Sequence, residues 1–259
     1  MAVTVASLHR HPVKGLSPQP LDRVHLDEGG HFPGDRLYAI ENGPAGYDPE
    51  NPLHQPKIKY LMLMRNPRLA AFQTHYDDET GVLRFARNGK VVAEGDLTTA
   101  AGRGAIEAFL LVEFADELRG APKVLTASGG YRFMDSAKSG FVSLLNLSSV
   151  RALAALAGRR TLDPARFRMN IALEGLPPWG EFDLIGKDIR VGGATLHVLK
   201  ATDRCAAINA APGIGLRDVD LIPRMEERLG HHDCGVYARV VAAGPVAVGD
   251  AVLGEAGLG

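Results

Sequence analysis

The chain has few cysteines, no excess charge of either sign and no long apolar run. Two cysteines in 259 residues exclude a disulfide framework and the four cysteine ligands of a plant-type [2Fe–2S] cluster. A formal net charge of −1 argues against the broad positive field of a nonspecific nucleic-acid-binding protein. No apolar run reaches the roughly 18 residues that a membrane helix needs. We therefore expect no nucleic-acid partner and no membrane partner.

A targeting signal is also missing from the start of the sequence. Residues 1–10 alternate like a β-strand and lack the charged-then-apolar layout of a signal peptide. We therefore expect a cytoplasmic protein. A hydrophobic content of 46% and a charged content of 23% are those of an ordinary globular protein. The length fits one large domain or two modest ones.

Short strand-like segments separated by Gly, Pro and Asn dominate both ends of the sequence. The pattern predicts a mainly β protein with a few helices. The Asn-Gly pair within Arg87-Asn-Gly-Lys90 predicts a hairpin with a type I′ turn. Expected strands are residues 3–5, 36–40, 68–76 and 82–85, and expected helices are 100–111, 148–158 and 221–229, the second capped by its leading serines.

Cys205 has a sequence context that favours chemistry. It follows a strand-like run over residues 194–199, and Asp203 and Arg204 directly precede it. A neighbouring cation lowers the pKa of a thiol, and the thiolate attacks electrophiles and ligates soft metals. A buried structural thiol remains the alternative. For Cys234 we expect that structural role, because the stretch from His231 to Cys234 lacks the paired ligands of a zinc site.

Three polar residues, Arg166, Arg168 and Asn170, alternate with apolar ones. In a strand, alternate residues share a face, so we expect the three to point the same way. Such a set suits recognition of an anion and an amide, since the planar guanidinium fork donates two hydrogen bonds at once. A solvated face of an edge strand is the alternative interpretation.

Four segments, in this order, resemble the MOSC family with its N-terminal β-barrel domain. They are His11-Pro-Val-Lys-Gly15, Gly34-Asp-Arg-Leu-Tyr38, Ala165-Arg-Phe-Arg-Met-Asn-Ile171 and Asp203-Arg-Cys205, followed by Gly235-Val-Tyr-Ala-Arg-Val240 and Val248-Gly-Asp250. The family includes the mitochondrial amidoxime-reducing component and the C-terminal part of molybdenum cofactor sulfurases. The resemblance implies an N-terminal β-barrel domain over residues 1–120 and a MOSC β-barrel domain over residues 121–259.

The resemblance also implies a molybdenum cofactor, with Cys205 as catalytic residue and metal ligand. The cofactor bears a phosphate and a pterin, which need cationic and hydrogen-bonding groups around them. Serines ahead of the expected second helix would add hydroxyl donors. The cofactor-binding residues that we expect are Lys14, Gly15, Arg36, Ser136, Ser139, Ser143, Arg166, Arg168, Asn170, Asp203 and Arg204.

The resemblance favours an oxidoreductase that reduces N-oxygenated, including N-hydroxylated, small-molecule substrates. A molybdenum cofactor carrier or a sulfur carrier with a Cys205 persulfide is the first alternative, and a non-catalytic binding module is another. A cysteine hydrolase would use Cys205 with His197, His231 or His232 as base. No Gly-x-Gly-x-x-Gly fingerprint opens a helix after a strand. For a reductase we therefore expect a separate electron-donor protein: a ferredoxin, a cytochrome or a flavoprotein.

Overall fold

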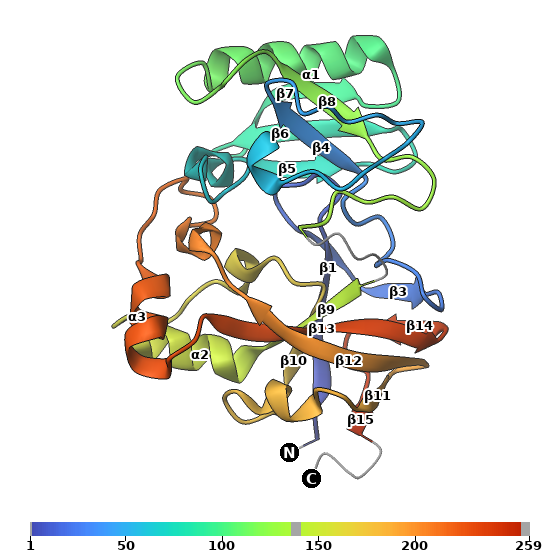
Figure 1. The fold of residues 1–259 in the computed structure, drawn as a ribbon, viewed down its shortest axis with the longest axis vertical. Coiled ribbons are helices and arrows are strands. Elements are labelled where there is room, and N and C mark those ends of the chain that lie inside the picture. Colours follow the sequence, from blue (N-terminus) through green and yellow to red (C-terminus); the bar gives the residue numbers. More distant parts are fainter. Residues whose placement is uncertain (1, 136–140, 255–259) are drawn as a thin grey trace.

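The structure is a computed structural model that describes residues 2–135 and 141–254. Within these ranges it is mainly β-sheet with three α-helices, which confirms the predicted fold class. Figure 1 shows a larger sheet in the lower part of the molecule and smaller sheets with helix α1 (Ala100–Glu113) above it. No described helix is long and apolar enough to cross a membrane.

The larger sheet has eight strands in the order β15-β11-β12-β13-β9-β10-β1-β2. All described pairings are antiparallel except that of β9 with β10. Backbone hydrogen bonds from Val5 N to Asp250 O (2.9 Å) and from Val252 N to Val3 O (2.8 Å) join the two sides of the curved sheet. The described strand pairings do not close into a continuous barrel. The strands are β1 (Thr4–Arg10), β2 (Gln19–Leu21), β9 (Phe141–Asn146), β10 (Ile171–Glu174), β11 (Asp188–Val191), β12 (Ala194–Asp203), β13 (Asp233–Ala242) and β15 (Val252–Gly254).

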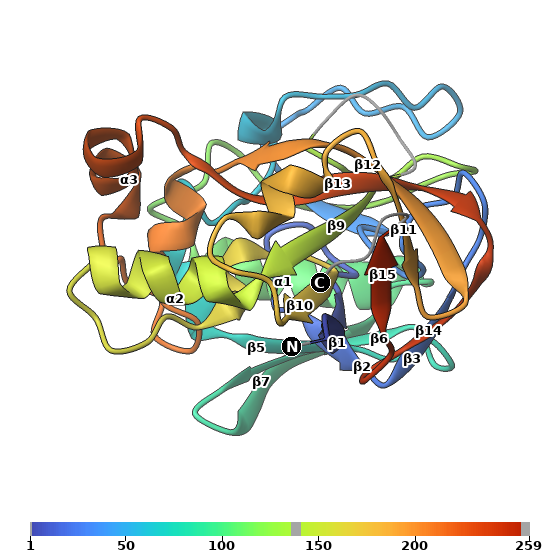
Figure 2. The same ribbon diagram turned by 90° about the horizontal axis from the view of Figure 1, so that it is seen from below.

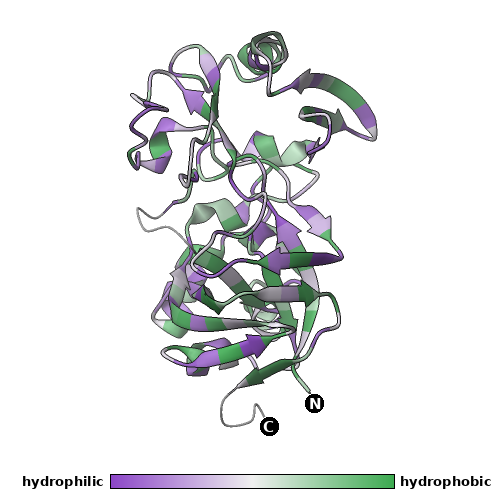
Figure 3. Cartoon of the chain, turned by 90° about the vertical axis from the view of Figure 1, so that its right-hand side faces the viewer, coloured by the Kyte–Doolittle hydropathy of each residue, from purple (hydrophilic) through white to green (hydrophobic). Residues whose placement is uncertain are grey.

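The first strands of the chain belong to this C-terminal sheet. Strand β1 lies between β10 and β2, and β3 (Arg23–Leu26) pairs with β14 (Gly244–Ala247). Along the strands hydrophobic and hydrophilic positions alternate (Figure 3), as expected where one face is buried. The buried face forms one core that includes Leu8, Val142 and Leu196. The chain then leaves this sheet for the upper half, so the two halves are connected at more than one point.

The upper half holds two small sheets and a separate core. Strand β4 (Tyr38–Asn42) pairs with β8 (Pro122–Thr126), and β5 (Gln73–Tyr76), β6 (Val82–Arg87) and β7 (Lys90–Asp96) form a meander. Helix α1 buries Ile106 and Leu110 against this core. The predicted hairpin is confirmed, since Arg87 pairs with Lys90 and the two turn residues have positive φ.

Helices α2 (Leu147–Leu156) and α3 (Leu221–Leu229) lie together at one end of the larger sheet (Figure 2). The predicted positions of all three helices are confirmed, but Asn146, not a serine, caps α2 by accepting from Ser148 N at 3.0 Å. Short 3₁₀ helices connect the other elements. They are η1 (Lys57–Lys59), η2 (Pro67–Ala71), η3 (Pro164–Phe167), η4 (Gly180–Leu184) and η5 (Ala206–Asn209).

Two predicted strands are wrong in part, for one physical reason. Residues 68–76 begin as helix η2 and become strand β5 only at Gln73, and residues 166–170 comprise the end of η3 and a turn before strand β10. Pro67 and Pro164 occupy the first helical positions, where a fixed φ and a missing N–H favour a helical turn. Arg166, Arg168 and Asn170 therefore do not alternate along a strand.

Candidate functional site

A cavity between the two halves brings together most of the residues that the sequence singled out. It has a volume of about 290 Å³ and shares wall residues with a small pocket of about 50 Å³. We call the two together the Cys205 cavity. Lys14 and Gly15 line the small pocket, Arg204 and Tyr237 line the large one, and both share Arg36, Lys57, Asp135, Arg168, Cys205 and Ala207.

Cys205 stands between the end of β12 and the start of η5, in extended backbone and partly exposed. Arg204 fixes this segment, because its guanidinium donates to Phe167 O and contacts the Met169 sulfur at 3.4 Å. The thiol segment is thereby attached to the turn that carries Arg168. Cys234, in contrast, has no exposed surface, and burial raises the pKa of its thiol. Its predicted structural role is confirmed.

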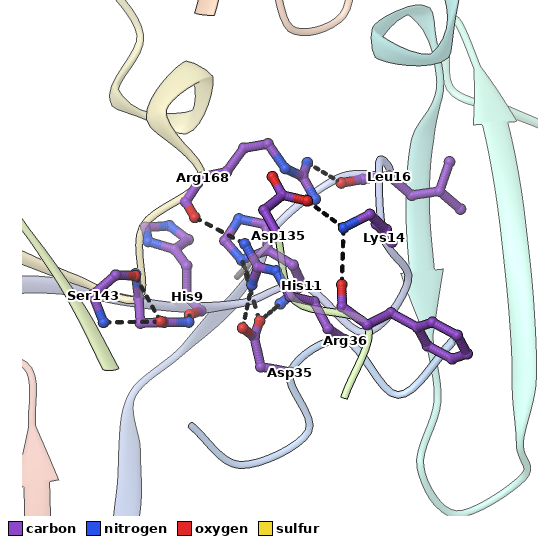
Figure 4. Close-up of polar contacts among 11 residues, drawn as sticks. His9, His11, Lys14, Leu16, Asp35, Arg36, Asp135, Ser143 and Arg168 are labelled. Atoms are coloured by element: carbon purple, nitrogen blue, oxygen red, sulfur yellow. Dashed lines mark hydrogen bonds and ion pairs between the residues drawn. The ribbon is translucent and has the colours of Figure 1, made fainter. Parts of the chain in front are cut away.

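Lys14 and Asp135 form an ion pair on the upper wall of the cavity (Figure 4). The Lys14 ammonium also donates to Phe133 O at 3.0 Å. Burial lowers the pKa of Lys14. Burial raises the pKa of Asp135, but the charges of Lys14 and Arg36 outweigh it and hold that pKa well below its ordinary value. Asp135 is therefore ionised at neutral pH.

Arg36 is held by a buried carboxylate. Asp35, 2% exposed, accepts from His11 N at 2.5 Å and from the Arg36 guanidinium. Burial raises the pKa of Asp35, and the charge of Arg36 more than offsets this, so the net pKa is lowered. Burial, reinforced by the charge of Arg168, lowers the pKa of His11 to about 3. The imidazole is thus neutral, and the positive charge of the group resides on Arg36.

Arg168 contributes a positive charge to the site without a carboxylate in direct contact. Its guanidinium donates to Leu16 O, and no carboxylate within residues 2–135 and 141–254 pairs with it. Burial and the charge of Arg36 lower the pKa of Arg168 to about 9, which still leaves it charged at neutral pH. A cation that is largely withdrawn from water and has no carboxylate in direct contact is costly. The arrangement therefore favours an anionic ligand.

Both arginines occupy the left-handed backbone region, with φ of 52° for Arg36 and 54° for Arg168. A non-glycine residue there costs on the order of 1 kcal/mol or more, and such residues concentrate at functional sites. The two are joined directly, since Arg36 donates from Nη2 to Arg168 O at 3.3 Å. The strained backbone thus places two guanidinium groups on one wall of the cavity.

Asn170 and Ser143 are bonded mainly to each other and to β1. Asn170 Oδ1 accepts from Ser143 Oγ at 2.7 Å, Asn170 N donates to Ser143 Oγ at 3.0 Å, and Asn170 Nδ2 donates to His9 O at 3.2 Å (Figure 4). The Ser143 hydroxyl donates in this bond, and Ser143 lines the cavity, so its predicted contact with a phosphate stays a prediction. Ser136 and Ser139 lie outside the described residues.

Arg166 is directed to a different partner than expected. Its guanidinium pairs with Asp218 at 2.8 Å and donates to the carbonyls of Ile208 and Asn209 at 3.4 and 3.3 Å. It therefore ties η3 to η5, the helix that follows Cys205. Asp203 ends β12 on the surface, 3.9 Å from His232.

Gly15 occupies a position that only glycine fits without strain. Its φ is +84°, and a Cβ there would lie 2.8 Å from Leu61 O. A left-handed conformation and this close approach explain why glycine stands where the resembled motif has serine.

Among the wall residues that were not identified from the sequence are Lys57, Lys200 and Tyr237. Tyr237 stacks on Phe141 with ring centroids 5.4 Å apart, and the Lys200 ammonium lies 5.9 Å from the Tyr237 ring. Tyr237 does fall in a segment of the MOSC resemblance, which was a usable signal. Lys57 lies in the 3₁₀ helix η1 and Lys200 lies within strand β12. Lysine at such positions is ordinarily a surface residue.

The histidines that a cysteine hydrolase would need are engaged elsewhere. His197 Nδ1 lies 2.6 Å from Asp188, His232 Nε2 lies 2.9 Å from Glu226, and His231 Nδ1 accepts from Asp233 N at 3.0 Å. None of them is among the residues that line the Cys205 cavity. The described site therefore offers no cysteine–histidine dyad.

Two family models match the chain. The model of the MOSC N-terminal β-barrel domain matches residues 2–119, and the model of the MOSC domain matches residues 134–253. The chain belongs to the MOSC domain family, and this membership associates it with the molybdenum cofactor. The domain boundary at residue 120 stays a prediction.

Several solved structures are similar to this chain at low identity. The YuaD protein from Bacillus subtilis is 13% identical over 97% of this chain and 94% of its own, with a TM-score of 0.46. YiiM from Geobacillus stearothermophilus is 19% identical over 44% of this chain and 53% of its own, with a TM-score of 0.34. YiiM from Escherichia coli is 19% identical over the same shares, with a TM-score of 0.33. No curated protein sequence matches.

Proposed function

We propose that this protein binds the molybdenum cofactor in the Cys205 cavity, with Cys205 as metal ligand, and reduces N-oxygenated small molecules. One observation carries the proposal. The partly buried Arg168 cation, which no described carboxylate contacts, lines the same cavity as the partly exposed Cys205 thiol. A soft metal ligand and a surplus positive charge are what a dithiolene-bound metal with a pendant phosphate requires.

The residues of the cavity fit this cofactor. Arg168 and Arg36 would hold the phosphate, since their guanidinium groups are fixed by Leu16 O and Asp35. Lys14 adds a third cation on the same wall. Cys205 would supply the thiolate to the metal. When bound, the cofactor supplies two-electron, oxygen-transferring redox chemistry.

The protein groups supply orientation, charge balance and proton donors. Burial raises the pKa of Tyr237, so its hydroxyl is protonated at neutral pH and can donate a hydrogen bond into the cavity. Asp135 is ionised and offsets the charge of Lys14. Lys200 and Tyr237 also line this cavity and would be available to contact a substrate.

The decisive experiment is purification from a cofactor-producing host with molybdenum and pterin quantified. We expect about one of each per chain, and turnover of an N-hydroxylated test substrate with an artificial dye as electron donor. NADH or NADPH alone should give no turnover, because a separate donor protein is expected. A chain without molybdenum would overturn the proposal. Full loading without turnover under any donor would instead indicate a cofactor or sulfur carrier.

A further inference from the structure

A second cavity of about 320 Å³ lies behind the Arg168 turn. It is formed by both halves of the molecule and shares four residues with the Cys205 cavity, namely Gly15, Leu63, Arg166 and Arg168. We call it the Leu69 cavity. Its volume is at the lower end of the roughly 300–1,000 Å³ typical of small-molecule sites. Its wall comes from residues 15–18, from η2 and β5, from η3 and from residues 210–213.

Most of this wall is apolar. The two residues that anchor it, Leu69 and Phe72, are each 1% exposed and belong to the core of the upper half. Leu16 and Leu63 are also buried. The polar side chains of Ser17 and Thr74 on this wall are bonded to each other's backbone N–H groups at 3.0 and 3.1 Å. An apolar ligand body would therefore meet a surface whose polar groups are already satisfied.

The remaining part of the wall is cationic. Arg166 is 6% exposed. Its Nε atom is buried and has no hydrogen-bond partner in the described structure. Arg168 has no carboxylate within hydrogen-bonding or ion-pairing distance in the described ranges. A buried donor without an acceptor is costly, and a carboxylate ligand would satisfy it. Asp163 is the one acidic residue of the wall, and it is exposed.

We propose that the Leu69 cavity binds a small apolar monocarboxylate, with its carboxylate at Arg166 and Arg168 and its apolar body against Leu69 and Phe72. A ligand without an acceptor would leave the buried Arg166 Nε–H unsatisfied and Arg168 without a carboxylate partner, although the Arg166 charge is itself paired with Asp218. A compact dianion such as phosphate would leave the apolar wall uncovered and meet repulsion from Asp163. The proposal does not rest on the function proposed for Cys205, because every group that it uses belongs to the chain itself.

The two cavities should influence each other through Arg168. A guanidinium that is engaged by an anion on one side is less available to an anion on the other. Linkage is reciprocal, so occupancy of either cavity weakens anion binding in the other by the same factor.

Titration calorimetry on the full chain tests the proposal with 2-naphthoate as the probe. We expect saturable binding of 2-naphthoate and no binding of its neutral analogue 2-naphthalenemethanol at the same concentrations. Equal binding of the neutral analogue would overturn the assignment of Arg166 and Arg168. Absence of 2-naphthoate binding to the folded wild-type chain would overturn the site.

Two alanines provide matched variants, because each lines one cavity and not the other. Ala165 lines the Leu69 cavity, and Ala207 lines the Cys205 cavity. Ala165→Leu should reduce 2-naphthoate affinity at least about 10-fold by filling the site, while Ala207→Leu should leave it unchanged. Ala70→Leu fills the Leu69 cavity from the opposite wall and serves where Ala165→Leu does not fold. The reverse pattern, with Ala207→Leu alone abolishing binding, would place the probe in the Cys205 cavity and contradict the proposal.

Discussion

The eight-stranded sheet and the Cys205 cavity follow opposite rules. In the sheet, strand β12 alternates buried and more exposed residues over most of its length, and the buried face is aliphatic. Around the cavity, Lys14 and Asp35 are charged yet at most 5% exposed, and two arginines have left-handed backbone. The sheet is what local propensity and pattern dictate. The cavity is built from conformations and burials that cost free energy.

The difference shows where stability and function reside. Strained backbone and buried charge persist only where the surrounding structure holds them in place, and they concentrate at functional sites. Here the surrounding structure supplies specific bonds, such as Asp35 to Arg36 and Asn170 to β1. Changes at the cavity should therefore affect ligand binding more than stability, and changes in the sheet should do the reverse.

The two cysteines test this division most strongly. Cys205→Ser should abolish molybdenum-dependent activity with little change in the free energy of unfolding. Cys234→Ser should keep activity but lose about 1–3 kcal/mol of stability, because it places a hydroxyl in an apolar core. Denaturant titrations and dye-driven turnover measure both quantities. Equal loss of activity in the two variants would contradict the assignment of Cys205.

Arg168 and Arg166 give a smaller, graded contrast. Arg168→Ala should reduce cofactor affinity by about 10- to 100-fold, since a hydrogen bond to a charged group is worth about 1.5–3 kcal/mol. Arg168→Lys should lose less, because it keeps the charge but not the two-pronged donor. Cofactor content after purification measures the effect.

The matched control is Arg166→Ala, which breaks the ion pair with Asp218. It should lower stability more than cofactor content. The assignment would be contradicted if cofactor content were unchanged in Arg168→Ala and reduced in Arg166→Ala. Arg166, not Arg168, would then hold the anion.

Sequence reasoning succeeded where one local rule sufficed. The Asn88-Gly89 turn, the three helices and the buried Cys234 were all predicted from short patterns. Lys14, Arg36, Arg168 and Cys205 were singled out, and the structure brings them to one cavity. That convergence depends on pairing between β1 and β10, residues far apart in the chain, which composition and spacing do not encode.

Sequence reasoning failed where a competing rule prevailed. The Arg-x-Arg-x-Asn pattern suggested one face of a strand, but Pro164 begins a 3₁₀ helix and Arg168 turns the chain. Arg166 and Arg168 consequently bond to different partners, Asp218 and Leu16 O. The alternation rule was sound, and the secondary structure to which it was applied was wrong.

The last expected effect is a dependence of stability on pH, and it concerns His11 beside Asp35. Its pKa of about 3 in the folded chain lies below the ordinary value of 6.5, so the unfolded chain binds the extra proton first. Stability should therefore fall as pH drops from 6.5 toward 3, by up to about 1.4 kcal/mol per pH unit from this residue. His9 and His31, whose pKa values burial also lowers, add to the same slope.

Asp35 contributes to the pH dependence of stability at lower pH values than His11 does. Its depressed pKa stabilises the folded chain above the unfolded value of 3.8, and that stability is lost only below it. Denaturant titrations between pH 6.5 and 4.5 therefore isolate the histidines. His11→Gln should flatten the slope there, whereas His25→Gln, at an exposed position, should leave it unchanged. An unaltered slope in His11→Gln would mean that His11 is protonated in the folded chain. The positive charge beside Asp35 would then be shared between His11 and Arg36.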